Sequence, residues 1–274
     1  MSNGFQTLQV ISSCTGLHVM LGARSTGSTS DSLELGLAGL LAEHEAGGEP
    51  VTVVTLRVVR AEDAFWAMTA LRWLSGHGRR VILRTAKVLA KPLVLAARDC
   101  GATVVLEMAH SRLEVQRALL GPEADAAPAL LLQAQHLRRL GIGVAVQLGP
   151  LVAGLHDRPG QIDGLVRHIA AADIHDVHLG VARLTPERLQ ALLAALDVEG
   201  AHEVQRRYGV TTSTGSWRLS ALAANTLREG ARSLVHGEGL VVDGCGCGAH
   251  CHLDLAERRA YVSVQGPELF AEAP

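Results

Sequence analysis

Short runs of β-branched and other apolar residues alternate with longer segments of helical periodicity over the first two thirds of the chain. One such run and the helical segment after it occupy about 25 to 35 residues, the length of a strand–helix unit in a parallel sheet. This alternation predicts an α/β protein in which helices cover a sheet of parallel strands. The expected strands are Leu8–Ser12, Val51–Val59, Arg80–Lys87, Ala102–Ala109, Ile142–Leu148 and Asp176–Ala182.

Six strand–helix units are too few to close an eight-stranded barrel. We therefore expect an open, partial (β/α)6 barrel of the TIM type, with a doubly wound sheet as the alternative. The segment Thr185-Pro186-Glu187 is typical of a helix start, because threonine can cap a helix that proline begins. The alternation stops near Glu199, and helical periodicity returns at Trp217–Val235. We expect a barrel domain over residues 1–210 and a C-terminal helix with a Cys/His-rich, metal-binding tail over residues 211–274.

The composition is that of a folded protein with little attraction for nucleic acid. Of its 274 residues, 48% are hydrophobic and 19% are charged, which excludes a disordered chain. A net charge of -2 with three Trp, three Phe and two Tyr provides neither a strong field for phosphates nor many stacking surfaces for bases. The sequence shows no signal-peptide pattern and no stretch of about 18 uninterrupted apolar residues, so we expect a cytoplasmic protein without a membrane partner.

Thiols and imidazoles crowd into one short, glycine-rich segment near the C-terminus. The set comprises Cys245, Cys247, His250, Cys251 and His252. Thiolates and imidazoles bind zinc and other borderline-soft metals, and the interleaved glycines allow a short loop to fold around one ion. The spacing differs from the C-x2-C of zinc ribbons. Zinc is therefore our first expectation, an iron–sulfur cluster the second and copper or another metal the third, while a tail that binds no metal is the remaining alternative.

An ordered series of segments in the body carries a family likeness. The series comprises Arg84-Thr-Ala-Lys87, Leu93–Cys100, Val104-Val-Leu-Glu, Leu137-Arg-Arg-Leu-Gly-Ile, Val146–Asp157 with its proline loop and Gly-Leu-x-Asp turn, and Val177–Pro186. In this order they resemble the radical S-adenosylmethionine (SAM) proteins of the spore photoproduct lyase and DNA-photolyase-like group, over about residues 8–235. In that family, three thiolates of a C-x3-C-x2-C loop after the first strand hold a [4Fe-4S] cluster, and one iron stays open for SAM.

The cluster motif is degenerate in this chain. Cys14 matches the first cysteine, whereas His18 and Leu21 stand in place of the second and third, and leucine cannot ligate iron. After the second strand, the family's Asp-Pro-Tyr-Gln-Pro-x-Glu type of segment is reduced to Glu62. The resemblance implies that Cys14, His18 and Glu62, together with Arg84, form the cofactor site. The two departures argue against SAM as a cofactor and indicate that this site has been rebuilt.

Polar residues at the carboxyl ends of the expected strands are the candidates for catalysis, because ligands of parallel α/β proteins bind at that edge. Glu107 and His110 lie at the end of the fourth strand, and Lys87 closes the third, which also carries Arg84. A buried Glu107 could ligate a metal or accept a proton. The alternative for Arg84 and Lys87 is that they pair with carboxylates.

Three functions are compatible with these features. The first, which we favour, is a metal-dependent enzyme acting on a small molecule, in which the tail holds the metal at the barrel mouth and Cys14 and His18 complete its ligands. The second is a catalytically inactive, radical SAM-like protein that binds a ligand or a partner protein and uses the tail site for stability. The third is an unusual radical SAM enzyme whose iron–sulfur cluster is held by the C-terminal cysteines.

Overall fold

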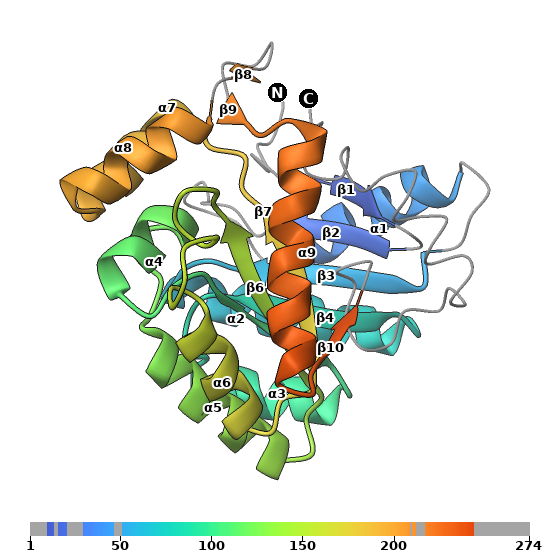
Figure 1. The fold of residues 1–274 in the computed structure, drawn as a ribbon. Coiled ribbons are helices and arrows are strands. Elements are labelled where there is room, and N and C mark those ends of the chain that lie inside the picture. Colours follow the sequence, from blue (N-terminus) through green and yellow to red (C-terminus); the bar gives the residue numbers. More distant parts are fainter. Residues whose placement is uncertain are drawn as a thin grey trace.

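Helices and parallel strands alternate along the chain and form a layered α/β structure in the computed structural model (Figure 1). The structure describes residues 10–13, 16–20, 30–46, 51–208, 210–211 and 217–243. The strands of the main sheet are β1 Val10–Ser13, β2 Gly16–Met20, β3 Val53–Val58, β4 Arg80–Thr85, β5 Thr103–Met108, β6 Val144–Leu151, β7 Asp176–Val181 and β10 Val241–Asp243. A separate two-stranded sheet contains β8 Val210–Thr211 and β9 Trp217–Arg218.

The helices follow the strands as the sequence periodicity predicts. Their bounds are α1 Ser30–Glu45, α2 Ala64–Gly76, α3 Lys91–Asp99, α4 Leu113–Leu120, α5 Ala127–Arg139, α6 Asp163–Ala171, α7 Pro186–Ala195, α8 Val198–Arg207 and α9 Ala221–Gly237, with a 3-10 turn η1 at Ala61–Asp63. Within the described ranges, no helix is both long enough and apolar enough to cross a membrane.

The strands of the main sheet stand side by side in chain order, from β1 to β7 and then β10. β1 pairs antiparallel with β2, and each later pair of neighbours is parallel. A doubly wound sheet would reverse its strand order part-way. That alternative is therefore wrong, and the prediction of a partial α/β barrel is confirmed. Among the described strands, β1 and β10 are the two edges, so the barrel is open.

The beginning of the sheet differs from the prediction. The first strand is half of a hairpin, since β1 turns directly into β2. His18 was expected in a loop after the first strand, but it lies inside β2, where it pairs in register with Thr55 of β3. Two short antiparallel strands and one strand with a loop have similar local patterns, and only the pairing distinguishes them.

The later boundaries also shift. β6 continues past Leu148 to Leu151, and its register with β7 is irregular there, which is where a strand tolerates a proline. The helix predicted from Trp217 begins at Ala221, because the hydroxyl of Ser220 caps it. α8 adds a helix where the alternation was expected to end.

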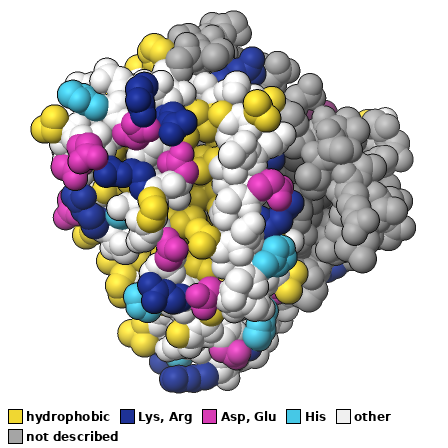
Figure 2. All heavy atoms as spheres, in the orientation of Figure 1, with side chains coloured by type: hydrophobic (Ala, Val, Ile, Leu, Met, Phe, Trp, Pro, Cys, Tyr) yellow, Lys and Arg dark blue, Asp and Glu magenta, His cyan; other side chains and the backbone are white. Residues whose placement is uncertain are grey.

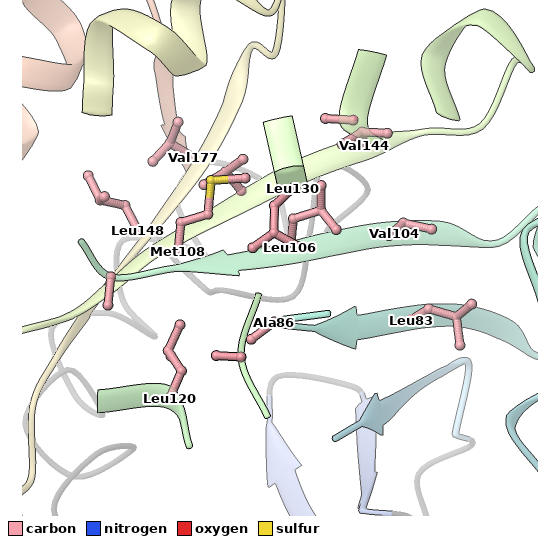
Figure 3. Close-up of a cluster of buried hydrophobic side chains, with 14 of the residues drawn as sticks. Leu83, Ala86, Val104, Leu106, Met108, Leu120, Leu130, Val144, Leu148 and Val177 are labelled. Atoms are coloured by element: carbon pink, nitrogen blue, oxygen red, sulfur yellow. The ribbon is translucent and has the colours of Figure 1, made fainter. Parts of the chain in front are cut away.

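The main hydrophobic core lies between the sheet and its outer helices. Leu56, Leu83 and Leu106 contribute from three neighbouring strands, and Leu71 of α2 and Leu130 of α5 belong to the same cluster. Figure 3 shows part of this cluster, in which side chains from β4, β5, β6 and β7 meet those of the helices. The burial of these apolar side chains is the main source of the fold's stability.

The C-terminal helix is part of the same core. Leu227, Ala231 and Val235 of α9 are buried in the cluster that contains the barrel residues. After α9 the chain adds β10 to the sheet, parallel to β7. One hydrophobic core therefore extends across the domain boundary that was expected near residue 210, as far as the described chain continues.

Candidate functional site

The inner face of the sheet changes from apolar to polar toward the carboxyl ends of its strands. Its apolar part is a separate small cluster of Val53, Ile82, Val105 and Ala145. On β4, β5 and β6, the residues two positions after the apolar ones are Arg84, Glu107 and Gln147. On β3, Arg57 lies four positions after the apolar residue and pairs in register with Arg84. Strand residues two apart share a face. The polar residues therefore stand above the apolar layer at the mouth of the barrel, where parallel α/β proteins bind ligands.

Glu107 is held between two arginines. Its carboxylate is 3% exposed, and one oxygen, Oε1, accepts a hydrogen bond of 2.6 Å from Arg84 Nε. The other oxygen, Oε2, accepts from Arg57 Nε at 3.2 Å and from Arg57 Nη2 at 2.9 Å. The arginine side chains are more open, at 27% exposure for Arg57 and 22% for Arg84. The two cations thus lie between the buried acid and the solvent.

The charges of this cluster set the ionisation of Glu107. Burial raises the pKa of its carboxyl, but Arg84 and Arg57 together lower it by more, so the net shift is downward. The pKa of Arg188, in the first turn of α7, is also lowered. Partial burial of its guanidinium is the main cause and the charge of Arg57 adds to it, while Glu107 opposes the change.

The structure brings two of the predicted site residues together, Arg84 and Glu107. Lys87 does not join them, because its Nζ lies 3.0 Å from Oε2 of Glu123, a half-exposed carboxylate in the loop before α5. The alternative expectation, that Arg84 and Lys87 pair with carboxylates, is therefore confirmed.

His110 belongs to a different buried network. Its Nδ1 accepts the backbone N–H of Arg112 at 2.9 Å, and its Nε2 is 3.2 Å from Oε1 of Gln161. Its ring centroid lies 6.1 Å from that of His156, whose Nδ1 accepts from Val152 N and whose Nε2 lies 2.9 Å from the carbonyl of Ala109. Burial lowers the pKa of both imidazoles, to about 3 for His156. The pair is neutral, and its ring nitrogens are occupied by the protein.

The remaining candidates are less closely defined. Glu62 lies in η1, 72% exposed, with Oε1 3.6 Å from Arg60 Nη1. Cys14, Leu21 and the tail residues Cys245, Cys247, His250, Cys251 and His252 lie outside the described residues. Within the described ranges, no group of three His, Cys, Asp or Glu side chains could hold a metal ion.

The sequence analysis did not identify Arg57 or Arg188 as site residues. Arg57 lies in an otherwise apolar strand, Val-Val-Thr-Leu-Arg-Val. A charge at an inward position of such a strand indicates a buried partner or a ligand. Arg188 lies on an expected helix, where an arginine is ordinarily solvated. Its electrostatic interaction with Glu107 depends on where the chain turns into α7 after β7.

A second concavity lies on the outside of the barrel. Figure 2 shows hydrophobic side chains in a hollow beside α9, and a cavity of about 600 Å³ is lined there by Ala153, Leu219, Leu227 and Leu234, among others. The charged groups at its rim have partners within the protein. Asp157 accepts from Gly154 N at 2.7 Å, and Arg207 pairs with Glu203 at 3.0 Å. The hollow is therefore mainly apolar, in contrast to the barrel mouth.

The comparisons with known proteins concern the fold. No family model and no curated protein matches this sequence. The chain is similar to the solved structure of Streptococcus suis SuiB, a radical SAM enzyme bound to S-adenosylmethionine, with a TM-score of 0.51 and 10% identity over 83% of this chain. At this identity the likeness concerns the fold alone. The chain spans about half of SuiB, 46% of its length. HMG-CoA lyase from Brucella melitensis matches over 78% of both chains at 13% identity, but its TM-score is only 0.37.

The resemblance seen in the sequence implies an iron–sulfur cluster with SAM, and the described residues do not form a site for the cluster. Cys100, the free cysteine of the described ranges, lies at the end of α3. Burial raises the pKa of its thiol, which disfavours the thiolate that iron requires. No step can therefore be assigned through a cluster held by the part of the chain that the structure describes.

Proposed function

We propose that this chain is a radical SAM-like barrel protein that binds a small-molecule substrate at the carboxyl-end mouth and acts on it as a metal-dependent enzyme. The observation that carries the proposal is the cluster of Glu107, Arg57 and Arg84. A buried acid paired with two partly exposed cations is costly to assemble, and it lies at the edge where barrels of this class bind their ligands.

The metal belongs to the C-terminal segment in this proposal. Cys245, Cys247, His250, Cys251 and His252 supply the donors that zinc prefers, and zinc is our first choice over an iron–sulfur cluster. A bound zinc ion would polarise a substrate oxygen or activate a water molecule. Cys14 and His18 are the candidates to complete its ligand set from the first strands of the barrel.

The barrel residues bind and orient the substrate. Arg57 and Arg84 present donors at the mouth, and Glu107 keeps them in place through its two oxygens. We assign no proton transfer to Lys87 or His110, because Lys87 is bound to Glu123 and both ring nitrogens of His110 have partners. Glu62 remains a candidate for cofactor contact from the edge of the mouth.

Elemental analysis of freshly prepared protein, with an absorption spectrum recorded under anaerobic conditions, tests this proposal. We expect colourless protein with one tightly bound zinc ion per chain. The double variant Cys245→Ser, Cys247→Ser should lose the metal, while Cys100→Ser should retain it. Unchanged metal content in the double variant would contradict the assignment. Brown protein with absorbance near 400 nm would show that the tail holds an iron–sulfur cluster and not zinc.

A further inference from the structure

The two arginines of the mouth have more donors than Glu107 uses. A guanidinium carries five N–H donors. Arg57 directs its Nε and one N–H of Nη2 to Glu107, and Arg84 directs only its Nε. Within the described ranges, the Nη groups of Arg84 and Nη1 of Arg57 have no hydrogen-bond partner. Both side chains remain about a quarter exposed, so a ligand at the mouth can reach these donors.

The charges of the cluster do not balance. Among the described residues, one carboxylate is paired with the guanidinium groups of Arg57 and Arg84, which leaves one positive charge in a partly buried site. If the only role of these arginines were to neutralise Glu107, one of them would suffice. Bringing a second cation close to the first costs free energy unless another anion offsets their repulsion.

We propose that Arg57 and Arg84 form a binding site for an oxyanion group on the substrate, such as a phosphate monoester or a dicarboxylate. The proposal rests on the proposed function in placing the substrate at this mouth. An oxyanion offsets the excess positive charge, and its oxygens accept the paired N–H donors of a guanidinium. Glu107 is a positioning residue, because it holds the Nε edges of Arg57 and Arg84 and leaves their Nη groups for the ligand.

Calorimetric titration of the full-length protein with inorganic phosphate and with succinate, at constant ionic strength set by NaCl, tests the proposal. We expect saturable binding of at least one of the two anions. Arg57→Gln, which removes one of the two guanidinium groups, should weaken binding by about tenfold or more. Arg139→Gln is the matched control. Arg139 is an exposed arginine at the end of α5, close in sequence to the amino end of β6, and the mouth lies at the carboxyl ends of the strands.

A second variant guards against a folding defect. Arg84→Lys keeps the charge that pairs with Glu107 but loses the planar fork, so it should fold and bind the anion several-fold more weakly. Stronger binding of phosphate than of succinate identifies the ligand as a phosphate ester, and the reverse order identifies a dicarboxylate. Equal affinity in the wild type and Arg57→Gln, or no saturable binding of either anion, would overturn the proposal.

The same titration separates this inference from the metal assignment. The Cys245→Ser, Cys247→Ser variant should bind the anion as the wild type does, because the arginines are independent of the tail. Loss of anion binding in that variant would show that the anion binds a metal instead of the arginines. A protein that binds phosphate but contains no metal would leave the arginine site standing and reject only the metal-dependent function.

Discussion

A carboxylate whose two oxygens are both held by guanidinium groups is a poor proton acceptor. Glu107 was expected from the sequence to ligate a metal or to act as a base, and its contacts with Arg57 and Arg84 favour a positioning role instead. Because its native pKa lies below the ordinary value, its charge stabilises the fold above the unfolded pKa, and this contribution is lost as the pH falls through the native pKa.

The buried imidazole of His156 makes the stability of the protein depend on pH. Its native pKa is about 3, while an unfolded histidine has a pKa of about 6.5, because burial opposes the charged form. Below about pH 6.5 the unfolded chain binds a proton that the native protein excludes, so stability should fall by up to about 1.4 kcal/mol per pH unit for this group. Urea unfolding at pH 7.5 and pH 5 measures the change.

Replacement of the imidazole tests the cause of this pH dependence. His156→Gln should reduce the difference in unfolding free energy between the two pH values, although His110, whose pKa is also lowered, still contributes. His136→Gln, at an exposed position on α5, should leave the difference unchanged. Equal pH dependence in the wild type and His156→Gln would exclude His156 as its source.

At the scale of the helices, the start of α7 controls where Arg188 lies. The hydroxyl of Thr185 accepts the backbone N–H of Arg188 at 3.3 Å, as the sequence Thr-Pro-Glu predicted. Thr185→Ala should cost about 1 kcal/mol of stability, because the capped N–H loses its partner. Thr185→Ser, which keeps the hydroxyl, should restore the stability. Thermal unfolding of the three proteins measures the effect, and a neutral Thr185→Ala would contradict the role of the cap.

Local signals predicted most elements but not all of their ends. The helix at Pro186 is evident from its capping residue and proline, and β3, β4, β5 and β7 from their apolar runs. The β1–β2 hairpin and the extension of β6 depend on pairing with neighbouring strands. A strand's partner can lie far away in the sequence, so its register is not contained in a short window.

At the scale of the whole molecule, one core joins the barrel to its C-terminal helix. Leu106 of β5 and Leu227 of α9 belong to the same buried cluster. Leu106→Ala and Leu227→Ala should therefore each lower the free energy of unfolding by about 2 to 5 kcal/mol. Each variant should still unfold in a single transition, with its midpoint at a lower urea concentration. Urea denaturation followed by both fluorescence and circular dichroism measures whether the transitions coincide.

An exposed leucine on the same helix provides the control. Leu222 of α9 is 79% exposed, so Leu222→Ala should change the stability by no more than about 0.5 kcal/mol. Two separate transitions, with Leu227→Ala affecting only one, would show that the C-terminal helix folds independently of the barrel.

The sequence alone determined the class of fold, the strands and helices that follow one another along the chain, and a mouth lined by Arg84 and Glu107. These features depend on periodicity and on the polar ends of strands, which are local properties. Only the tertiary structure decided what the mouth contains. Arg57 lies 50 positions before Glu107 in the chain, so their charges meet only when the strand order brings β3, β4 and β5 side by side.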